Sequence, residues 1–365
     1  MLKDANPSDA FIGLNLLRGA RSRAQEFALL RPRGPEALVD LGGEMLASPW
    51  GASLVRELER GGWMERGAQE REAVSARGAH MLTPVEEGFP GLLRNVPDPP
   101  LALYVEGEFR PEDAHAIAIV GTRTASRYGR RMAERIAGEV AARGLTVVSG
   151  LARGIDGIAH RAALDAGGRT VAVLGCGLDH QYPREHGELR AAIARSGAVL
   201  SELPPDVPPR PQNFPRRNRL ISGLALGVLV VEATEKSGAL ITARHALEQG
   251  RDVLAVPGNA DFPKSRGTNG LIKQGAQLVE TADDVIETLR EDVRQSLRAP
   301  RPRGEEEALS EPERQVLAFL EEGEKPIDQL IEELRRPAGE VAGYLLQLEL
   351  KGRVRQHPGQ VFARS

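Results

Sequence analysis

The sequence predicts an α/β fold with a doubly wound, mostly parallel, Rossmann-like sheet, flanked by a small helical domain and a winged-helix domain. The first observation is a series of short apolar runs at 116–120, 146–149, 170–174, 198–201, 227–231 and 252–256. The second is that helical patterns of about 10 to 15 residues separate these runs, which is typical of a parallel sheet buried on both faces. The third is the length of 365 residues, which is enough for two or three compact domains.

Four segments are expected along the chain. Residues 1–85 predict a small helical domain, because short amphipathic patterns alternate with glycine and proline, at 11–18, 21–30, 35–41 and 52–60. Residues 86–292 carry the sheet. Residues 293–308 contain Pro300, Pro302 and Gly304 before a glutamate run, which is typical of a linker. Residues 309–365 predict a winged helix, because a Ser310/Glu313 capping box opens the first of three helical patterns and a hairpin follows them.

The composition excludes several classes of protein. With 41% hydrophobic and 27% charged residues, the chain is not intrinsically disordered. No apolar run approaches the roughly 20 residues that a membrane span needs, so we expect no membrane association and a cytoplasmic location. Cys176 is the only cysteine, which excludes an internal disulfide and a cysteine-rich zinc site.

Charge is unevenly distributed along the chain. Residues 115–220 contain 16 arginines and no lysine against 9 carboxylates, although the whole protein has a net charge of −3. Arginine binds phosphate in planar, bidentate geometry, so this excess favours an anionic partner. A general preference for arginine over lysine explains the choice of residue but not the local excess.

The segments that follow the predicted strands are rich in glycine, serine, threonine and arginine. In an open parallel sheet these segments meet at one edge, where helix N-termini offer N–H groups to anions. Arg123, Arg127, Arg153 and Arg184 lie on or just after them, and Arg217 and Arg219 precede the fifth strand. We therefore expect a groove that binds phosphates. Tyr128, Tyr182 and Phe214 each neighbour an arginine and could stack on bases, with core packing as the alternative for Tyr128 and Phe214.

The hypothesis that the protein is an enzyme has less support in the sequence. The first turn, Gly121-Thr-Arg-Thr-Ala-Ser126, departs from the dinucleotide fingerprint, and no Walker A motif occurs. Asp156 and His160 are interpreted as a helix-start residue and its packed neighbour rather than a catalytic pair. No spacing matches a common zinc site, and we expect no cofactor. The alternative that stays open is a nucleoside-monophosphate-processing enzyme that uses Glu202 or Glu232 as its acid. A closed pocket would favour that enzyme, and a continuous groove would favour a strand.

Several stretches together resemble the DprA/Smf family of DNA-processing proteins of natural transformation. They are Ile119-Val-Gly-Thr-Arg123, Tyr128-Gly129, Val148-Ser-Gly-Leu-Ala-Arg-Gly-Ile-Asp156, Ala159-His160, Val173-Leu-Gly-Cys-Gly-Leu-Asp179, Tyr182-Pro183, Phe214-Pro-Arg-Arg-Asn-Arg219, Ile221-Ser-Gly-Leu224, Ser237-Gly-Ala-Leu-Ile-Thr-Ala243, Glu248-Gln-Gly-Arg-Asp252 and Val256-Pro-Gly258. The resemblance covers about residues 90 to 290. One departure is His186, where the family commonly has asparagine.

The resemblance implies a non-enzymatic recombination mediator that binds and protects incoming single-stranded DNA, forms a homodimer and loads RecA onto the strand. It assigns strand contacts to Arg123 and Arg184, dimer contacts to Ile272 and Leu278, and a RecA contact to Leu247. Taken with the strand-end segments, it gives the expected single-stranded DNA site: Gly121, Arg123, Arg127, Ser149, Gly150, Arg153, Tyr182, Arg184, Arg217, Asn218, Arg219, Ser237 and Gly238.

The resemblance also implies an N-terminal domain of the SAM or helix-hairpin type and a DML1-like winged helix. The third helical pattern of the winged helix, 338–350, contains Glu340 and Glu349 and no basic residue. A recognition helix in the major groove uses basic or amide side chains. We therefore expect the winged helix to contact a protein in preference to double-stranded DNA.

Overall fold

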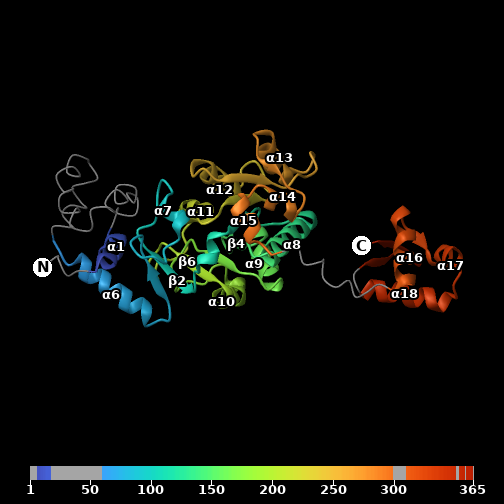
Figure 1. Cartoon of the computed structure of the whole chain (residues 1–365), viewed down its shortest axis with the longest axis horizontal. Coiled ribbons are helices and arrows are strands. Elements are labelled where there is room, and N and C mark those ends of the chain that lie inside the picture. Colours follow the sequence, from blue (N-terminus) through green and yellow to red (C-terminus); the bar gives the residue numbers. More distant parts are fainter. Residues whose placement is uncertain (1–5, 18–59, 299–309, 351–352, 358, 365) are drawn as a thin grey trace. The chain divides into compact units, whose positions relative to one another are not determined.

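The computed structural model describes residues 6–17, 60–298, 310–350, 353–357 and 359–364. The chain divides into two compact units, residues 1–300 and 301–365 (Figure 1). Of the helices expected near the N-terminus, the first is found as α1 (Pro7–Leu16). The others fall at 21–60 and, apart from Arg60, lie outside the described residues.

The larger unit is built on a nine-stranded sheet in the order β1-β2-β6-β5-β4-β3-β7-β8-β9. All neighbours from β6 to β9 are parallel, whereas β1 and β2 form an antiparallel extension at the β6 edge. The strands are β1 (His80–Leu82), β2 (Leu103–Gly107), β3 (Ala116–Val120), β4 (Thr146–Ser149), β5 (Thr170–Val173), β6 (Ala198–Ser201), β7 (Gly227–Val230), β8 (Asp252–Ala255) and β9 (Gln277–Leu278). The predicted doubly wound α/β fold is confirmed, and the six predicted runs are β3 to β8.

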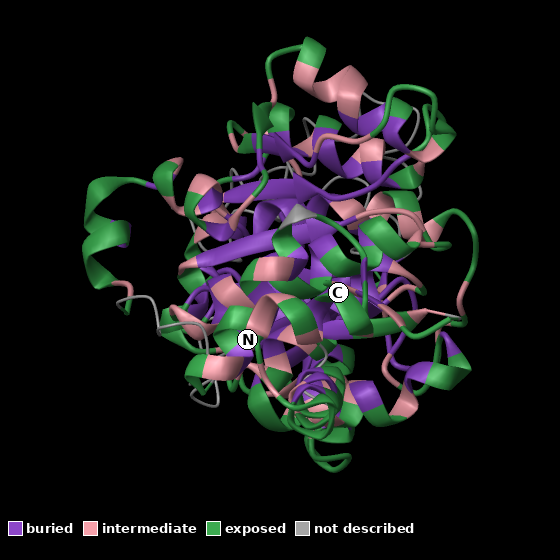
Figure 2. Ribbon diagram, turned by 90° about the vertical axis from the view of Figure 1, so that its right-hand side faces the viewer, coloured by how far each residue is buried: buried purple, intermediate pink, exposed green. Residues whose placement is uncertain are grey.

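Helices cover both faces of this sheet, as the continuous apolar strands require. One face packs against α8 (Arg127–Ala142), α9 (Ile155–Asp165), α10 (Gly187–Ser196), α14 (Ala282–Glu287) and α15 (Glu291–Ser296). The other packs against α7 (Gly91–Arg94), α11 (Asn213–Gly223), α12 (Gly238–Glu248) and α13 (Arg266–Lys273). Figure 2 shows the strands as buried almost throughout and the outer faces of the helices as exposed.

The segment before the sheet packs against its antiparallel edge. Helices α1 and α6 (Trp63–Ser75) share an apolar cluster with β1 and β2, formed by Ile12, Val74, Met81, Ala102 and Tyr104. Strands β1, β2 and β9 were not expected from the sequence. Because β1 joins the sheet, the sheet begins before residue 86, where we expected the α/β domain to start.

The described residues of the second unit form the predicted winged helix. It contains α16 (Glu311–Phe319), α17 (Ile327–Leu334), α18 (Ala338–Leu350) and a sheet of β10 (Lys325–Pro326), β12 (Val361–Arg364) and β11 (Val354–His357) in that order. The capping box is present, because the Ser310 N–H donates to Glu313 Oε2 at 2.7 Å. The predicted linker, 293–308, starts inside α15, and its residues 299–308 lie outside the described residues. Short 3-10 turns occur at Pro111–Ala114, Arg184–His186, Pro263–Ser265 and Leu320–Glu322.

Candidate functional site

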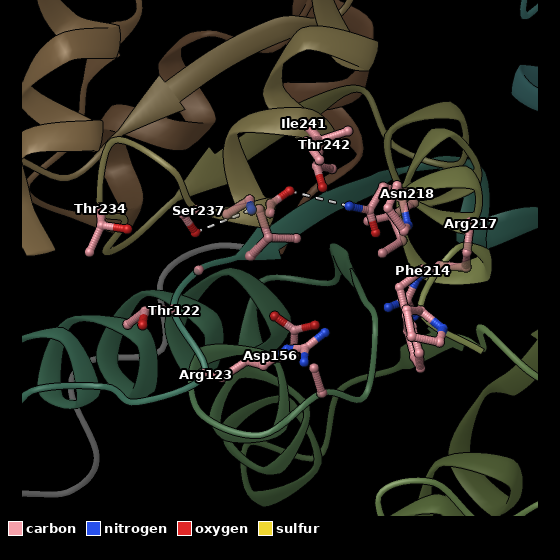
Figure 3. A pocket seen from close by; sticks show the side chains of 18 of the residues that line it. Thr122, Arg123, Asp156, Phe214, Arg217, Asn218, Thr234, Ser237, Ile241 and Thr242 are labelled. Carbon is pink, nitrogen blue, oxygen red and sulfur yellow. Dashed lines mark hydrogen bonds between the residues drawn. The ribbon is translucent and has the colours of Figure 1, made fainter. Parts of the chain in front are cut away.

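The sheet has a topological switch point at β3, which has β4 on one side and β7 on the other. A pocket of about 480 Å³, the switch-point pocket, opens at the carboxyl ends of these strands (Figure 3). This is the place where open α/β sheets bind ligands. Its lining includes Gly121, Thr122, Arg123, Asp156, Tyr182, Phe214, Arg217, Asn218, Thr234, Ser237, Gly238, Ile241 and Thr242.

The loop after β3 is fixed by close backbone packing. The Thr122 N–H donates to the Glu232 carbonyl at 2.7 Å, and a Cβ added at Gly121 would lie 2.6 Å from Ile155 Cγ1. Glycine is therefore required at 121 for the close approach of this loop to α9. The loop presents the exposed Arg123 side chain toward the pocket (Figure 3).

Two aromatic side chains form one wall of the site. The rings of Tyr182 and Phe214 lie 5.3 Å apart at an interplanar angle of 45°. The Arg123 guanidinium carbon lies 5.6 Å from the centre of the Phe214 ring, within cation–π range. Tyr182 is 40% exposed, so the wall is open to solvent. An exposed cation next to accessible rings offers both phosphate contact and base stacking.

Below this wall, buried charged groups form what we call the floor: Asp156, Arg217, Arg219 and Glu202. Burial raises the pKa of the Asp156 carboxyl, and the charge of Arg217 partly offsets this shift. Burial likewise lowers the pKa of the Arg217 guanidinium to about 10. Arg217 Nη1 donates to the carbonyl of Gly150 at 2.7 Å and to that of Val173. A Cβ at Gly150 would lie 2.6 Å from this guanidinium, so glycine leaves room for the buried cation.

Two residues expected to contact the strand do not face the pocket. Arg219 is 4% exposed and pairs with Asp98 at 2.7 Å and with Glu202 at 2.5 Å. Ser149 is fully buried, and its hydroxyl donates to the Ile119 carbonyl at 2.6 Å. Both side chains are therefore used inside the fold, which differs from the expectation that they contact DNA.

Seven of the expected residues do come together in the switch-point pocket: Gly121, Arg123, Tyr182, Arg217, Asn218, Ser237 and Gly238. Ser237 caps α12, and the Asn218 side chain donates to the Gly238 carbonyl at 3.3 Å (Figure 3). Arg127 and Arg184 are exposed but lie outside the pocket lining. Arg153 is exposed and pairs with Glu185. The sequence analysis missed Thr122, Thr234, Ile241 and Thr242, although the small polar residues after the β3 and β7 runs were a usable signal.

The switch-point pocket continues into neighbouring hollows. A small one, lined by Gly150, Leu151, Arg153, Leu174, Gly175 and Pro183, shares Arg123, Ala152, Tyr182 and Phe214 with it. A third hollow, of about 360 Å³, shares Arg217 with the switch-point pocket, and its lining also contains Arg210 and Arg216. Because the hollows share lining residues and Tyr182 is 40% exposed, the site is a row of adjoining hollows open to solvent rather than one closed pocket, and we call this row the groove.

The candidate acids are occupied elsewhere. Glu232 is 2% exposed and accepts from the Ser126 N–H at 2.9 Å, and Glu202 pairs with Arg219. Neither lines the switch-point pocket. His160 is packed as expected, with Nδ1 2.6 Å from Thr170 Oγ1, and burial lowers its pKa to about 3. His186, the departure from the family pattern, is also buried, with Nδ1 3.0 Å from the Leu151 carbonyl.

Within the described ranges, no group of three or more His, Cys, Asp or Glu side chains is arranged to hold a metal ion. No helix in the same part of the chain is long and apolar enough to cross a membrane. The residues for which the resemblance implied protein contacts are accessible to different degrees: Leu247 on α12 is 63% exposed, Leu278 on the edge strand β9 is 41% exposed, and Ile272 on α13 is half-buried.

Residues 80–290 match the family model described as DNA recombination-mediator protein A, and residues 299–360 match that of the DprA winged helix domain. The chain belongs to the DNA recombination-mediator protein A family. The first match contains all the strands of the large sheet and the whole switch-point pocket. The resemblance to the DprA/Smf family that the motifs indicated is thereby confirmed.

Individual family members agree with this assignment. The chain is 45% identical to Protein Smf of Escherichia coli (strain K12) over 286 residues, which cover 77% of this chain and 76% of that protein. The X-ray structure of DprA from Streptococcus pneumoniae superposes with a TM-score of 0.57 at 38% identity, covering 62% of this chain and 81% of that one. A Helicobacter pylori DprA structure, whose title describes its single-stranded DNA binding mode, superposes with a TM-score of 0.52 at 32% identity, covering 59% and 96%.

Proposed function

We propose that this protein binds single-stranded DNA along the groove at the carboxyl ends of β3, β4, β5 and β7, without sequence preference. In this proposal it acts as a non-enzymatic recombination mediator that protects incoming strands in the cytoplasm and loads RecA onto them during natural transformation. Family membership supports the mediator class, and the Helicobacter pylori relative supports a single-stranded ligand.

The observation that carries the proposal is the packing of the Arg123 guanidinium and the tilted Tyr182 ring against Phe214 in an open groove. Each stacked base contributes about 1 to 3 kcal/mol regardless of its identity, which suits a ligand of mixed sequence. The exposed guanidinium of Arg123 can reach a phosphate, and Arg184 offers a second cation at the Tyr182 end of the groove. The alternative enzyme loses support because Glu232 lines none of the hollows that form the groove, and because Glu202, which lines the third hollow, is paired with Arg219.

The decisive test is fluorescence anisotropy of a labelled oligo-dT of about 30 nucleotides across a salt series. Arg123→Ala with Arg184→Ala should lower affinity and flatten the log–log salt slope by about 1.4, or about 0.7 per lost phosphate contact. The matched control is Arg66→Ala with Arg195→Ala, two exposed arginines outside the groove, which should match the wild type. If the wild type does not bind the oligonucleotide but hydrolyses nucleoside monophosphates, the alternative enzyme is favoured instead.

For the homodimer, we propose contacts around Ile272 and Leu278 on α13 and β9. The proposal draws support from the exposure of Leu278 on an edge strand, where apolar side chains and unpaired backbone groups favour pairing with another chain. Leu278→Arg should lower the mass measured by sedimentation from dimer to monomer. An unchanged mass would contradict this interface.

For RecA, we propose a contact that includes Leu247. The supporting observation is that this leucine is 63% exposed on α12, where a solitary apolar side chain is available to a partner. Leu247→Glu should abolish capture of RecA by the protein while leaving its affinity for oligo-dT unchanged. Equal capture of RecA by the wild type and by the Leu247→Glu variant would contradict this contact.

For the winged helix, we propose a protein partner. On α18, Leu346 is 58% exposed and Glu340 and Glu349 are exposed, which does not suit a DNA backbone. Tight binding of duplex DNA that is lost on removing residues 301–365 would contradict this proposal.

A further inference from the structure

A fourth hollow, also of about 360 Å³, adjoins the groove beside the N-terminal turns of α8 and α9. We call it the cationic hollow. Its ten described lining residues include His186 but no carboxylate and no Phe, Tyr or Trp. Five of them are arginine or lysine. Its chemistry thus differs from that of the switch-point pocket, which combines aromatic rings with the Asp156 carboxyl.

The charge of the cationic hollow is incompletely neutralised within the fold. Arg153 pairs with Glu185, and Lys264 donates to the Thr124 carbonyl. Arg130 and Arg161 are exposed and form no ion pair with any described carboxylate. Exposed cations that converge on one hollow raise the local concentration of anions.

The position of Arg130 on its helix is also unfavourable without a ligand. The first turn of α8 contains Arg127 and Arg130 and no acidic residue, although the positive end of a helix dipole disfavours cations. A bound anion would relieve this repulsion and would also accept hydrogen bonds from the arginines. This arrangement is locally costly, and a bound anion would stabilise it.

The cationic hollow is continuous with the aromatic wall. It shares Arg123 and Arg153 with the small hollow, which in turn shares Tyr182 and Phe214 with the switch-point pocket. Arg123 thus lies at the junction of all three. A strand bound at Phe214 and Arg123 would therefore adjoin the cationic hollow, where its neighbouring phosphates could bind.

We propose that the cationic hollow is a second, purely electrostatic segment of the DNA site, which binds backbone phosphates of single-stranded DNA as it leaves the aromatic wall, with Arg130 and Arg161 as the ligands. This inference rests on the proposed function and adds a segment that the strand-end arginines alone did not predict. The protein then has two segments in series, one that stacks bases and one that binds phosphates without contacting bases.

The test compares a short oligo-dT of about 6 nucleotides with a long one of about 20 in anisotropy titrations across a salt series, using the full chain. Arg130→Ala with Arg161→Ala should flatten the salt slope on the long oligonucleotide by about 1.4, which corresponds to roughly 25-fold weaker binding at about 0.1 M salt. Binding of the short oligonucleotide should stay within about twofold. Arg130→Lys with Arg161→Lys should retain the slope on the long one, because charge rather than geometry is needed.

The outcomes separate the two proposals. Both proposals are supported if Arg123→Ala weakens the binding of both oligonucleotides and the Arg130/Arg161 variant weakens the binding of the long one alone. Normal binding and an unchanged slope on the long oligonucleotide for the Arg130/Arg161 variant overturn the second segment and leave the groove intact. A slope change seen with duplex DNA but not with oligo-dT also overturns it. Wild-type protein that binds neither oligonucleotide overturns the groove, and the second segment with it. The Arg66/Arg195 double variant serves as the matched control.

Discussion

The floor and the rim of the groove use the same residue type for opposite purposes. On the floor, Arg217 and Arg219 are 6% and 4% exposed, and both bond to groups within the protein. On the rim, which comprises Arg123, Arg130, Arg153, Arg161 and Arg184, the guanidinium groups are exposed. Among the rim residues only Arg153 pairs with a described carboxylate.

The difference shows that an arginine excess near a site cannot be equated with ligand contacts. A buried guanidinium needs acceptors throughout its environment, and here those acceptors are backbone carbonyls and carboxylates of the same chain. An exposed one can exchange water for a phosphate at little cost. The floor should therefore govern folding stability, whereas the rim should govern affinity and its dependence on salt.

The largest expected effect is on the floor. Arg217→Met should lower the free energy of unfolding by about 3 to 5 kcal/mol, because it leaves the buried Asp156 without its compensating cation. Urea denaturation followed by circular dichroism measures this loss. Arg123→Met, the matched change on the rim, should alter stability by less than about 0.5 kcal/mol. If Arg217→Met folds as stably as the wild type but no longer binds DNA, the division between floor and rim is wrong.

The next largest effect is expected at the aromatic wall. Phe214→Ala should weaken the binding of short and long oligonucleotides alike, by about 1 to 3 kcal/mol, because a stacked base is lost. The salt slope should not change, since no phosphate contact is removed. Anisotropy titrations at several salt concentrations separate the loss of base stacking from any loss of phosphate contacts. A flattened slope would show that Phe214 acts by positioning Arg123 rather than by stacking.

A smaller effect concerns pH. Burial lowers the pKa of His160 to about 3, below the ordinary value of 6.5, so the folded protein keeps this ring neutral. Stability linked to His160 is therefore complete above about pH 6.5 and is lost as the pH falls toward 3. Between about pH 7.5 and about pH 5.5 the wild type should lose about 1.4 kcal/mol more than His160→Gln in urea denaturation. Equal losses would mean that the histidine is not buried in its neutral form.

The smallest effect is expected on removing residues 301–365. The groove lies wholly in residues 1–300, so the affinity for oligo-dT should stay within about twofold of the full chain. Anisotropy under identical salt conditions measures it. A large loss would show that cations of the winged helix contribute to single-stranded DNA binding.

Much of the fold was predictable because its signals are local. Strands β3 to β8 are apolar runs between helical patterns, and this alone indicates a parallel sheet. Strands β1 and β9 have only three and two residues, too few for any periodicity. Strand β2 follows a proline-rich stretch and pairs with residues almost a hundred positions away, so local patterns gave no reason to add it to the sheet.

The site was predictable in location but not in detail. Strand order placed the loops at one edge, which correctly brought Arg123, Tyr182 and Ser237 together. The burial of Arg219 depends on Asp98, which lies 121 residues away in sequence, and no local pattern shows such a partner. Arg130 and Arg161 went unnoticed for a different reason. Both lie within helices rather than on strand-end loops. The absence of acidic residues from the first turn of α8 could have drawn attention to Arg130, but the first turn of α9 contains Asp156 and gave no such signal for Arg161.

The two carbonyls that accept hydrogen bonds from Arg217 belong to Gly150 and Val173, at the ends of β4 and β5. One guanidinium on α11 therefore joins two neighbouring strand ends and fixes the distance between the loops that follow them. These loops present Arg153 and Tyr182, so the spacing of the contact points is set before any ligand arrives. A preorganised surface loses little conformational entropy on association. In the proposed complex with single-stranded DNA, the ordering cost then falls on the flexible strand, which must adopt a shape that the protein already holds.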